Sequence, residues 1–558
     1  MLRLGVLLGS RTWRWWETEC VKSLLDTNGV AISVIVIHEE EDGAGAGPFL
    51  YRELKRLADR SARTLKRQPL RSVLGNVPVV EWDANRCSRT EELSAYRLDV
   101  VVSFRQQPPD PELVGVPRHG VWEFAYGEER VRSVFDDSYR CLLYRRPTVT
   151  VSLIRRQAGR YAVLKEGTTR AKRQSYFRNI DAANDLGLRW PSVVCRDVMN
   201  GNAPYLERWR EPAGNEAAPA FGGTAAEALK LGLSMGGCKL RNFVRHWFVA
   251  ERWNVGIADR PIHSFLEKPN LSRTEWLPKR SRYAADPFGI RMNGAVRILY
   301  EEFDYSTGKG VLRTADYAEG FRADGGTTDL ELPVHLSYPY LFTHEDRIYC
   351  IPESNEASRA TLYRADEYPR RWAKVRDILE NFRAVDSTVI RHEGRWWLFC
   401  TDGEKGPDSH LHIWYASEPE GEWKAHPLNP VKTDIRSSRP AGTPFYWKGR
   451  LYRPAQDCSE TYGGAVTLNR IVALTTEDFE EAVEARLTPD PNGPYPAGWH
   501  TLSSVGERTL IDSKTEAFHW QAFVSRVKAK LRAGRERERA SGAALPGRVE
   551  EKEGCYAE

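Results

Sequence analysis

Residues 335–353 read HLSYPYLFTHEDRIYCIPE, an aromatic strand, a short turn and a second strand that ends in a carboxylate. Three other stretches follow the same pattern: ADPF (285–288) leads to YEE (300–302), VDST (385–388) to WWLFCTD (396–402), and GTPF (442–445) to LYRPAQD (451–457). With positions 286, 338, 386 and 443 taken as equivalent, the steps between them are 52, 48 and 57 residues. Short strands that repeat at this interval are typical of a β-propeller.

The predicted propeller covers residues 246–515 and needs one more blade to close. We expect residues 253–257 to pair with residues 499–502, which would place both ends of this segment in a fifth blade. Such a closure leaves no open sheet edge in the ring.

The first part of the chain has a different texture. The apolar runs 4–8, 31–37 and 99–104 are separated by helical stretches, which predicts an α/β domain with a parallel, doubly wound sheet over residues 1–165. Residues 166–245 are expected to form a helical connector, and residues 516–558 a basic helix with a disordered tail. We expect this basic helix to be a solvated helix that caps the propeller, and peripheral contact with an anionic membrane is the alternative.

Composition excludes several classes of protein. The chain has 558 residues with 41% hydrophobic and 28% charged residues, so it is neither fibrous nor wholly disordered. A net charge of +5 over this length does not indicate a nucleic-acid partner. Nine scattered cysteines without a CxxC pair favour a reducing compartment, and we expect a cytoplasmic protein with no cofactor and no metal. His410 and His412 lie on one side of a strand but lack a third ligand.

The chemistry is predicted at the propeller axis, where the starts of the inner strands converge. Carboxylates gathered there suit acid and base work on sugars, and aromatic faces suit sugar rings. The candidate catalytic residues are Asp286, Asp386, Glu353 and Glu460. The candidate substrate-binding residues are Glu302, His335, Tyr338, Arg439, Asp457, Trp253, Trp499 and His500.

Residues 260–481 resemble the β-propeller domain named after the N-terminal part of plant glucosamine inositolphosphorylceramide transferase. The resemblance is carried by ADPF (285–288), HLSYPYLF (335–342), IPES (351–354), VDST (385–388), LHIWYASEPEGEW (411–423), HPLNPV (426–431), RP (439–440) and QDCSETYG (456–463). That domain is similar to the five-bladed fold of glycoside hydrolase family 43. This similarity implies a base at Asp286 and an orienting carboxylate at Asp386.

The same similarity places Arg439 near the position of the family's acid, so Glu353 or Glu460 would have to supply the proton. An arginine in the funnel instead favours an anionic group, such as a phosphate or a sugar carboxylate. Ordinary inverting hydrolysis is therefore not expected.

The first domain resembles the formyltransferase fold through DVVVSF (99–104) and PRHGVWEF (117–124). That family uses an Asn-x-His pair, and the corresponding positions here read Glu123 and Ala125. We therefore expect this domain to be catalytically inactive unless Glu123, His119 or the pair Asp136 and Asp137 has taken over.

Together these patterns predict a carbohydrate-binding or carbohydrate-processing protein of glycan or glycoconjugate biosynthesis. If it is an enzyme, it is a transferase or acts like a glycosidase, and its ligand is a sugar that is either free or carries a phosphate or nucleotide. Two alternatives stay open, a non-catalytic sugar-binding scaffold and a sugar N-formyl or N-acyl transferase.

Overall fold

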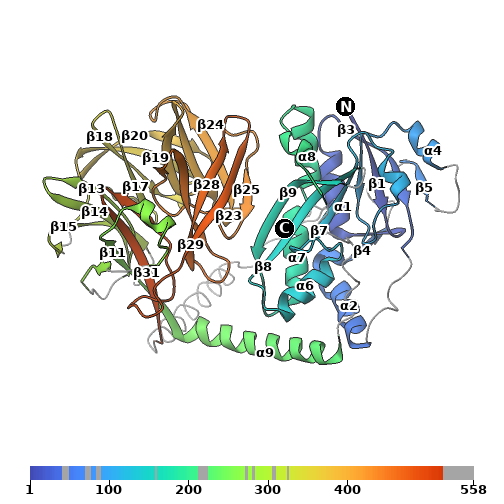
Figure 1. The fold of residues 1–558 in the computed structure, drawn as a ribbon, viewed down its shortest axis with the longest axis horizontal. Helices are drawn as coiled ribbons and strands as arrows, with labels where there is room; N and C mark the ends of the chain where they lie inside the picture. Colours follow the sequence, from blue (N-terminus) through green and yellow to red (C-terminus); the bar gives the residue numbers. More distant parts are fainter. Residues whose placement is uncertain are drawn as a thin grey trace, which may run out of the picture.

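The computed structural model describes residues 1–40, 49–69, 77–82, 89–157, 160–211, 224–270, 274–278, 283–304, 309–322 and 326–518. It contains an α/β unit and an all-β unit, and Figure 1 shows the helix α9 (Ala225–Phe248) running along the lower edge from one to the other. Within these residues no helix combines the length and the apolar character needed to cross a bilayer. The basic helix predicted for residues 516–558 lies almost entirely outside the described residues.

The α/β unit is built on one mixed sheet. Its parallel strands follow the order β5 (Val79–Glu81), β3 (Val30–Ile37), β1 (Leu2–Leu8), β6 (Val100–Ser103) and β7 (Val121–Tyr126). The antiparallel strands β8 (Thr148–Gln157), β9 (Arg160–Arg170) and β10 (Trp209–Arg210) extend it. A separate two-stranded sheet pairs β2 (Thr12–Arg14) with β4 (Arg67–Pro69).

Helices cover both faces of this sheet because successive side chains of a strand point to opposite sides. In β1, Leu4 and Val6 enter one hydrophobic core and Leu7 enters another. The larger core takes side chains from α1 (Trp15–Leu25), α2 (Phe49–Ser61), α6 (Val134–Leu143), α7 (Tyr176–Gly187) and α8 (Trp190–Met199). The smaller core takes them from α4 (Arg89–Ala95) and α5 (Pro111–Val114).

The predicted end of the first domain at residue 165 falls inside β9, so the boundary lies further along the chain. Ile180 of α7 and Val194 of α8 are both buried in the larger core of the α/β unit. Most of the described part of the segment predicted as a connector therefore belongs to the first unit, and α9 leads from it to the second. Because α7 and α8 also carry many polar surface residues, the sequence did not reveal the apolar side chains by which these helices pack.

The all-β unit consists of antiparallel sheets of about four strands, as expected for a propeller-like arrangement. The strands, sheet by sheet, are β13 (Tyr283–Met292), β14 (Ala295–Asp304), β15 (Lys309–Tyr317) and β16 (Phe321–Arg322); β17 (Ser337–His344), β18 (Arg347–Glu353), β19 (Arg359–Glu367) and β20 (Arg371–Glu380); β21 (Ala384–His392), β22 (Arg395–Asp402), β23 (Gly406–Ala416), β24 (Lys424–Ala425) and β25 (Lys432–Asp434); β26 (Phe445–Trp447), β27 (Arg450–Asp457), β28 (Ala465–Leu474) and β29 (Phe479–Leu487); and β12 (Thr274–Trp276), β11 (Val249–Ala258), β31 (Arg508–Phe518) and β30 (Leu502–Val505).

Short 3-10 turns complete the described elements at Arg63–Leu65, Pro204–Glu207, Ile262–Leu266 and Asn355–Ala357. Apolar side chains fill the space between neighbouring sheets of the all-β unit. One cluster joins the sheets that begin with β13, β17 and β21, and others join β22 to β27, β27 to β30, and β31 to β14. Each sheet thus buries both faces against its neighbours.

The last sheet joins the two ends of the all-β segment, but through a different pair of strands from the predicted one. Residues 249–258 of β11 pair with residues 509–518 of β31, and β30 lies on the far side of β31. The predicted direct pairing of residues 253–257 with 499–502 is therefore wrong, although both stretches do lie in the same region of this sheet. The sequence repeat ends before β31, so the repeat gave no signal for the strand in between.

A β-bulge marks the start of each of the inner strands β13, β17 and β21. The residue at the bulge has a left-handed backbone, with φ of 53° at Asp286, 41° at Tyr338 and 54° at Asp386. Gly442 takes the matching place before β26, with φ of 117°, one residue earlier than the predicted position 443. A bulge bends the strand and redirects the side chain, so the repeat aims these positions at the axis.

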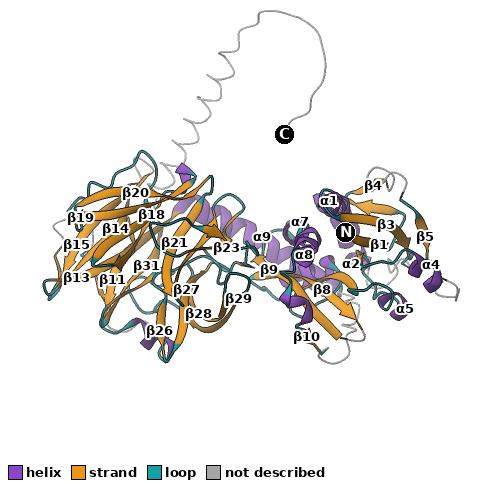
Figure 2. Ribbon diagram, turned by 90° about the horizontal axis from the view of Figure 1, so that it is seen from above, coloured by secondary structure: helices purple, strands orange, loops and turns teal. Residues whose placement is uncertain are grey.

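The two units are joined by backbone pairing as well as by α9. Thr433 and Asp434 of β25 pair in parallel with Gly167 and Thr168 of β9, so the third sheet of the all-β unit continues into the α/β sheet. The guanidinium of Arg170 donates to the carbonyl oxygen of Cys458 at 2.8 Å beside this junction. Figure 2 shows β9 facing β23 and β29 there.

Gly442 provides a test of the packing between the last two sheets. A Cβ at this position would lie 2.0 Å from the carbonyl oxygen of Leu502, and the backbone cannot move aside without separating the sheets. We expect Gly442→Ala to lower the free energy of unfolding by more than about 4 kcal/mol, measured by urea denaturation.

Gly449→Ala is the matched control, since Gly449 also has a positive φ of 73° but its Cβ would meet open space. Strain alone should cost this variant about 1–2 kcal/mol. Equal losses in the two variants would contradict the close approach of Gly442 to Leu502.

Candidate functional site

A cavity of about 580 Å³ opens at the axis of the all-β unit. Its wall is built from the inner strands and from the end of α9, which continues directly into β11. The lining residues are Arg245, His246, Val249, Ala250, Glu251, Trp253, Tyr283, Asp286, Glu301, Phe303, His335, Ser337, Glu353, Arg439 and Tyr462. The combination of several carboxyl groups with aromatic rings is the one predicted for a sugar site.

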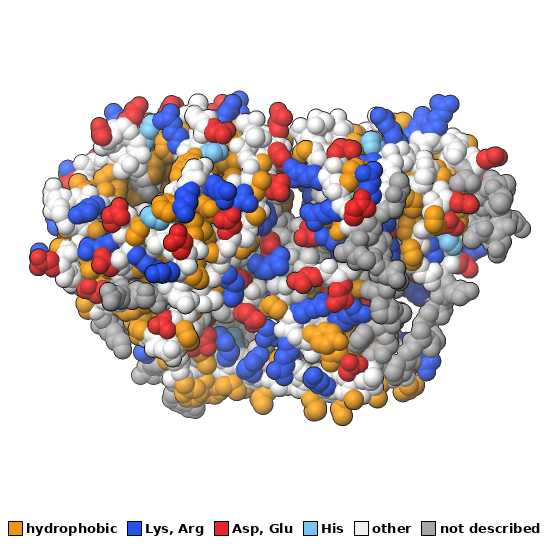
Figure 3. All heavy atoms as spheres, viewed as in Figure 1, with side chains coloured by type: hydrophobic (Ala, Val, Ile, Leu, Met, Phe, Trp, Pro, Cys, Tyr) orange, Lys and Arg blue, Asp and Glu red, His pale blue; other side chains and the backbone are white. Residues whose placement is uncertain are grey.

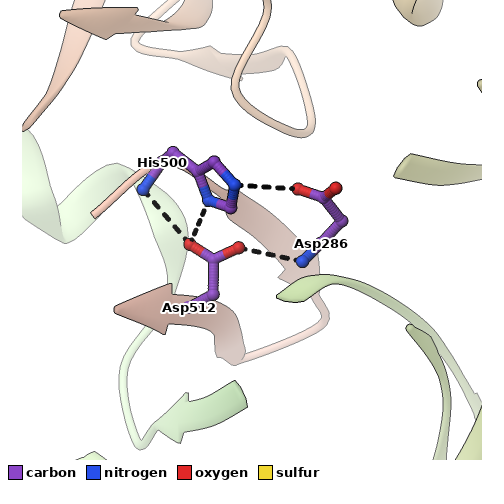
Figure 4. A group of neighbouring side chains, drawn as sticks. All are labelled: Asp286, His500 and Asp512. Atoms are coloured by element: carbon purple, nitrogen blue, oxygen red, sulfur yellow. Dashed lines mark hydrogen bonds and ion pairs between the residues drawn. The ribbon is translucent and has the colours of Figure 1, made fainter. Parts of the chain in front are cut away.

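Asp286 lies in a buried cluster with His500 and Asp512, shown in Figure 4. The backbone N–H of Asp286 donates to Asp512 Oδ2 at 2.9 Å, and the Thr501 hydroxyl donates to Asp286 Oδ1 at 2.8 Å. The ring of His500 places Nδ1 2.7 Å from Asp512 Oδ1 and Nε2 3.6 Å from Asp286 Oδ1. An imidazole between two carboxylates is held in one orientation and favours its charged form.

The ionisation of this cluster follows from burial and from its neighbours. Burial alone would lower the pKa of His500, but the carboxylates of Asp512 and Asp286 outweigh it and raise that pKa. Burial raises the pKa of Asp286 to about 6, although the charge of His500 opposes the rise. At neutral pH the cluster therefore presents an ionised Asp286 to the cavity.

Asp386 is the partner of Arg439. The guanidinium of Arg439 donates from Nε to Asp386 Oδ2 at 2.6 Å and from Nη1 to Asp408 Oδ1 at 3.1 Å. The side-chain amide of Gln456 donates to the same Asp386 oxygen at 2.8 Å. Burial disfavours the charge of Arg439, but Asp386, Tyr462, Glu353 and Asp408 together more than compensate and raise the pKa of Arg439. The arginine is thus committed to carboxylates of this chain.

Burial and nearby carboxylates favour the neutral form of two glutamates in the cavity wall. Burial raises the pKa of Glu301 well above its ordinary value, and the nearby Asp286 raises it further. Burial, followed by the charge of Asp386, does the same for Glu353. The cavity therefore contains carboxylic acids beside an ionised carboxylate. Carboxyl groups with pKa values pushed apart are the usual arrangement for an acid and a base in one site.

Aromatic residues form one side of the cavity. Trp253 stacks on the His500 ring with centroids 3.9 Å apart, and Tyr462 meets both rings edge-on. The ammonium of Lys514 lies 5.2 Å from the Trp253 ring. Stacking beneath Trp253 fixes its position at the wall, so the wall has a defined shape before any ligand enters.

The structure gathers about half of the predicted site residues. Asp286, Glu353, His335, Arg439 and Trp253 line the cavity. Asp386 and His500 lie directly behind this wall and contact Arg439 and Asp286, respectively. His335 accepts from the Gly310 N–H at Nδ1 and faces Glu301 with Nε2 at 3.4 Å.

The other predicted residues have different environments. Glu460 pairs with Arg173 of the α/β unit at 2.7 Å, Glu302 with Arg313 at 3.1 Å, and Asp457 with Arg486 at 2.7 Å. Trp499 is fully buried against Phe265 and offers no stacking surface. None of these four is among the lining residues of the cavity.

Tyr338 is also absent from the cavity wall, because its hydroxyl ties three sheets together beneath it. It contacts Thr388 Oγ1 at 2.9 Å and accepts from the Gly442 N–H at 2.6 Å. The repeat predicted Tyr338 as a substrate-binding residue, but in the structure its hydroxyl group is already satisfied by Thr388 and Gly442.

Glu301, Asp512, Tyr283 and Tyr462 are site residues that the sequence analysis missed. Glu301 and Glu302 are adjacent in β14, so they point to opposite faces of the strand. Strand alternation could have flagged Glu301 as a candidate beside Glu302. Asp512 lies in β31 beyond the repeat and carries no comparable signal.

Among the described residues, Asp286, His500 and Asp512 form the one group of acidic and histidine side chains with metal-ligand spacing, with their ligand atoms within 4.8 Å of one another. The charge on His500 balances the carboxylates in the same way that a cation would. A metal would therefore have to displace that proton. His410 and His412 do not add to the group, and burial lowers the pKa of His412 to about 4. The expectation of no metal stays a prediction.

The polar residues that the structure describes in the α/β unit do not form a comparable site. The carboxylate of Glu123 is buried and pairs with Arg156 and, at 3.3 Å, with Arg132. The cavity beside it, lined by Ser103, Phe124 and their neighbours, has a volume of only about 10 Å³. That is room for one water molecule and not for a folate. The resemblance to formyltransferases stays a prediction.

Residues 272–500 match the family model described as "Glucosamine inositolphosphorylceramide transferase 1, N-terminal". The chain is 35% identical over 209 residues to glucosamine inositolphosphorylceramide transferase 1 of Oryza sativa subsp. japonica, which covers 36% of this chain and 28% of that protein. The protein of the same name from Arabidopsis thaliana is 35% identical over 213 residues, or 36% of this chain and 27% of that protein. The resemblance predicted for the propeller segment is confirmed.

The chain thus spans little more than a quarter of the length of these relatives. The matched segment contains Asp286, Glu301, Glu353, Arg439 and His500, whereas α9, β11 and β31 lie outside it.

Solved structures of glycoside hydrolases are also similar, at low identity. A member of the GH130 family of mannoside phosphorylases is 11% identical with a TM-score of 0.33, covering 42% of this chain and 86% of that one. The family 117 glycoside hydrolase Zg3597 of Zobellia galactanivorans is 12% identical with a TM-score of 0.32, covering 48% and 91%.

The ionisation of His500 predicts how the stability of the fold depends on pH. A base whose pKa is higher in the folded than in the unfolded chain contributes stability that is fully present below the unfolded pKa, near 6.5, and is lost as the pH rises through the folded pKa. We expect the difference in unfolding free energy between the wild type and His500→Asn to be largest below pH 6.5 and to narrow above it. Each unit of raised pKa corresponds to about 1.4 kcal/mol, measured by urea denaturation across this range.

His426→Asn is the matched control, since burial lowers the pKa of His426. Its neutral ring bonds the carbonyl of Thr475 and the N–H of Leu428. The difference for this variant should therefore grow as the pH rises toward 6.5. A parallel pH profile for the two variants would show that His500 is not held as an imidazolium.

Proposed function

We propose that this chain processes a carbohydrate in glycan or glycoconjugate biosynthesis, as a transferase-like protein with its sugar site in the axial cavity. We further propose that the all-β unit is a closed, five-bladed propeller. The observation that carries the proposal is the pairing, in one 580 Å³ cavity, of an ionised Asp286 with the neutral acids Glu301 and Glu353. The match of the same segment to a transferase family supports it.

The residues have complementary roles in transfer of a glycosyl group. Asp286 accepts the proton of the attacking hydroxyl as the new bond to the anomeric carbon forms. Glu301 or Glu353 donates its proton to the oxygen that leaves the anomeric carbon. One proton is thus removed from the attacking hydroxyl and another is added to the leaving oxygen. This is general base and general acid catalysis by carboxyl groups with different pKa values.

Arg439 is a positioning residue in this proposal and not the anion-binding group that was expected. Its guanidinium already faces Asp386, Asp408 and Tyr462. A phosphate would have to compete with these carboxylates and would meet the charge of Asp286. The cavity therefore favours hydroxyl groups or an amine over an anionic group.

A non-catalytic sugar-binding module is the second candidate, favoured by the complete pairing of Asp386 with Arg439 and Gln456. The sugar N-formyl or N-acyl transferase is not favoured, because Glu123 is enclosed by arginines and the adjoining cavity is too small. A cytoplasmic location remains part of the proposal.

Binding of a sugar in the cavity is tested by calorimetry on the full chain, with glucosamine, myo-inositol, methyl mannoside and UDP-N-acetylglucosamine as probes. We expect Asp286→Asn to weaken binding of the best probe about tenfold or more, because a hydrogen bond to a charged acceptor is worth about 1.5–3 kcal/mol. Glu302→Gln is the control, since Glu302 faces Arg313 outside the cavity. A Kd altered equally by both variants, or unaltered by both, would place the sugar elsewhere.

Catalysis is separated from binding by Glu301→Gln. The amide matches the neutral carboxylic acid in size and charge but cannot give up a proton. With a donor that supports turnover by the wild type, we expect this variant to keep the Kd for the sugar within about twofold and to lose at least about 100-fold in kcat. Retained turnover would remove Glu301 from the role of acid, and binding without turnover in the wild type would favour the sugar-binding module.

A further inference from the structure

The long helix α9 exposes an unusual amount of apolar surface. Of sixteen large hydrophobic side chains exposed among the described residues, five belong to this one helix: Leu229 (64% exposed), Leu233 (71%), Leu240 (66%), Phe243 (58%) and Val244 (40%). Exposed hydrophobic residues scattered singly are ordinary, whereas a concentration on one element indicates a partner. Figure 3 shows hydrophobic side chains along the lower edge of the molecule, where α9 lies in Figure 1.

The five side chains form a stripe along α9. At 100° per residue they fall within an arc of about 100°, and the stripe runs for about 22 Å along the axis. The opposite side of the helix is the one that packs on the α/β unit, through the buried Ala228 and Leu231. Gly232, Gly236 and Gly237 have no atom within 4 Å of the place where a Cβ would lie, which confirms that this part of α9 is uncovered by the described residues.

Cationic residues flank the stripe on both sides. On the same helical projection Lys230 and Arg241 lie at one border and Lys239 at the other. The helix contains four lysines and arginines and a single acidic residue, Glu227. An amphipathic helix with lysine and arginine beside an apolar face is the arrangement that lies flat on a bilayer surface.

A groove runs beside the stripe and has the same character. It has a volume of about 560 Å³ and lies between α9 and the end of α6. Leu142, Leu229 and Leu233 contribute apolar surface, and Arg145, Lys230 and Arg241 contribute cations, whereas Arg173 in the same wall is paired with Glu460. No residue that lines the described wall of this groove is acidic. A surface that is both apolar and cationic complements the acyl chains and phosphates of an anionic lipid.

We infer that α9 docks this protein on an anionic lipid bilayer, with the stripe inserted at the level of the headgroups and the groove facing lipid phosphates. A second copy of the chain fits this surface less well, because two such helices would bring their cations together. The inference does not depend on the proposed sugar chemistry. It does place one wall of the axial cavity near the lipid, since Arg245, His246 and Val249 continue from the stripe into that wall.

Vesicle co-sedimentation of the full chain tests the inference, with phosphatidylcholine vesicles compared with vesicles of phosphatidylcholine and phosphatidylglycerol. We expect binding to the anionic vesicles that weakens as salt is added. The double variant Leu233→Asp/Leu240→Asp should lose at least about tenfold in bound fraction, because each substitution removes an apolar side chain from the lipid and puts a charge in its place. The double variant Lys230→Glu/Arg241→Glu should lose binding to the anionic vesicles, whereas its behaviour toward phosphatidylcholine vesicles should not change.

Leu25→Asp is the matched control, since Leu25 is an exposed leucine at the end of a helix in the α/β unit and lies outside the stripe. It should bind vesicles as the wild type does, and circular dichroism melts should show that all variants remain folded. Vesicle binding that survives in the Leu233→Asp/Leu240→Asp variant would place the membrane contact elsewhere and overturn the inference. No vesicle binding, together with a dimer in light scattering that the double variant converts to monomer, would show that the stripe is an interface between copies.

Discussion

In the inner strands β13, β17 and β21, one residue each takes φ between 41° and 54°, and the strand bulges at that point. Asp tolerates this conformation more readily than a bulky residue does, and Tyr338 is held in it by bonds from its hydroxyl to two other sheets. The bulges set the site because they direct the carboxylates of Asp286 and Asp386 toward the axis. Without the sheet-to-sheet contacts around Tyr338 and Gly442 the same backbone would relax, and the carboxylates would turn away.

Two cations, Arg439 and His500, compensate the carboxylates at the axis. Three carboxylates share these two cations, so one of them is compensated less fully than the others. Asp386 is matched by Arg439, and Asp512 by the imidazolium of His500, whereas Asp286 shares His500 and faces the cavity. Burial in the low-dielectric interior and the neighbouring carboxylates then raise the pKa of Glu301 and of Glu353, and for Glu353 they outweigh the opposing charge of Arg439, whose Nη2 lies 4.0 Å from Glu353 Oε2. The different pKa values of these carboxyl groups therefore follow from the distribution of two cations among them.

The repeat allowed the axial positions to be predicted from sequence, and Asp286, Asp386, Glu353 and Arg439 do meet there. The repeat did not identify the correct residue in every strand. It pointed to Glu302, but the neighbouring Glu301 lines the cavity, because successive side chains of a strand point to opposite faces. Asp512 and β31 lie beyond the repeat, so their part in the last sheet and in the His500 cluster could not be predicted. Glu460 forms an ion pair with Arg173 of the other unit instead of lining the cavity. A contact between residues so far apart in the sequence cannot be predicted from local patterns.

The strand pairing between β25 and β9 has a consequence for the chain as a whole. Either sheet, taken alone, would end there in a row of unpaired N–H and C=O groups, which can recruit the edge of another molecule. In the intact chain, each unit pairs with this part of the other unit's sheet edge. Separating the two units would therefore leave the backbone groups of residues 433–434 and 167–168 without these partners.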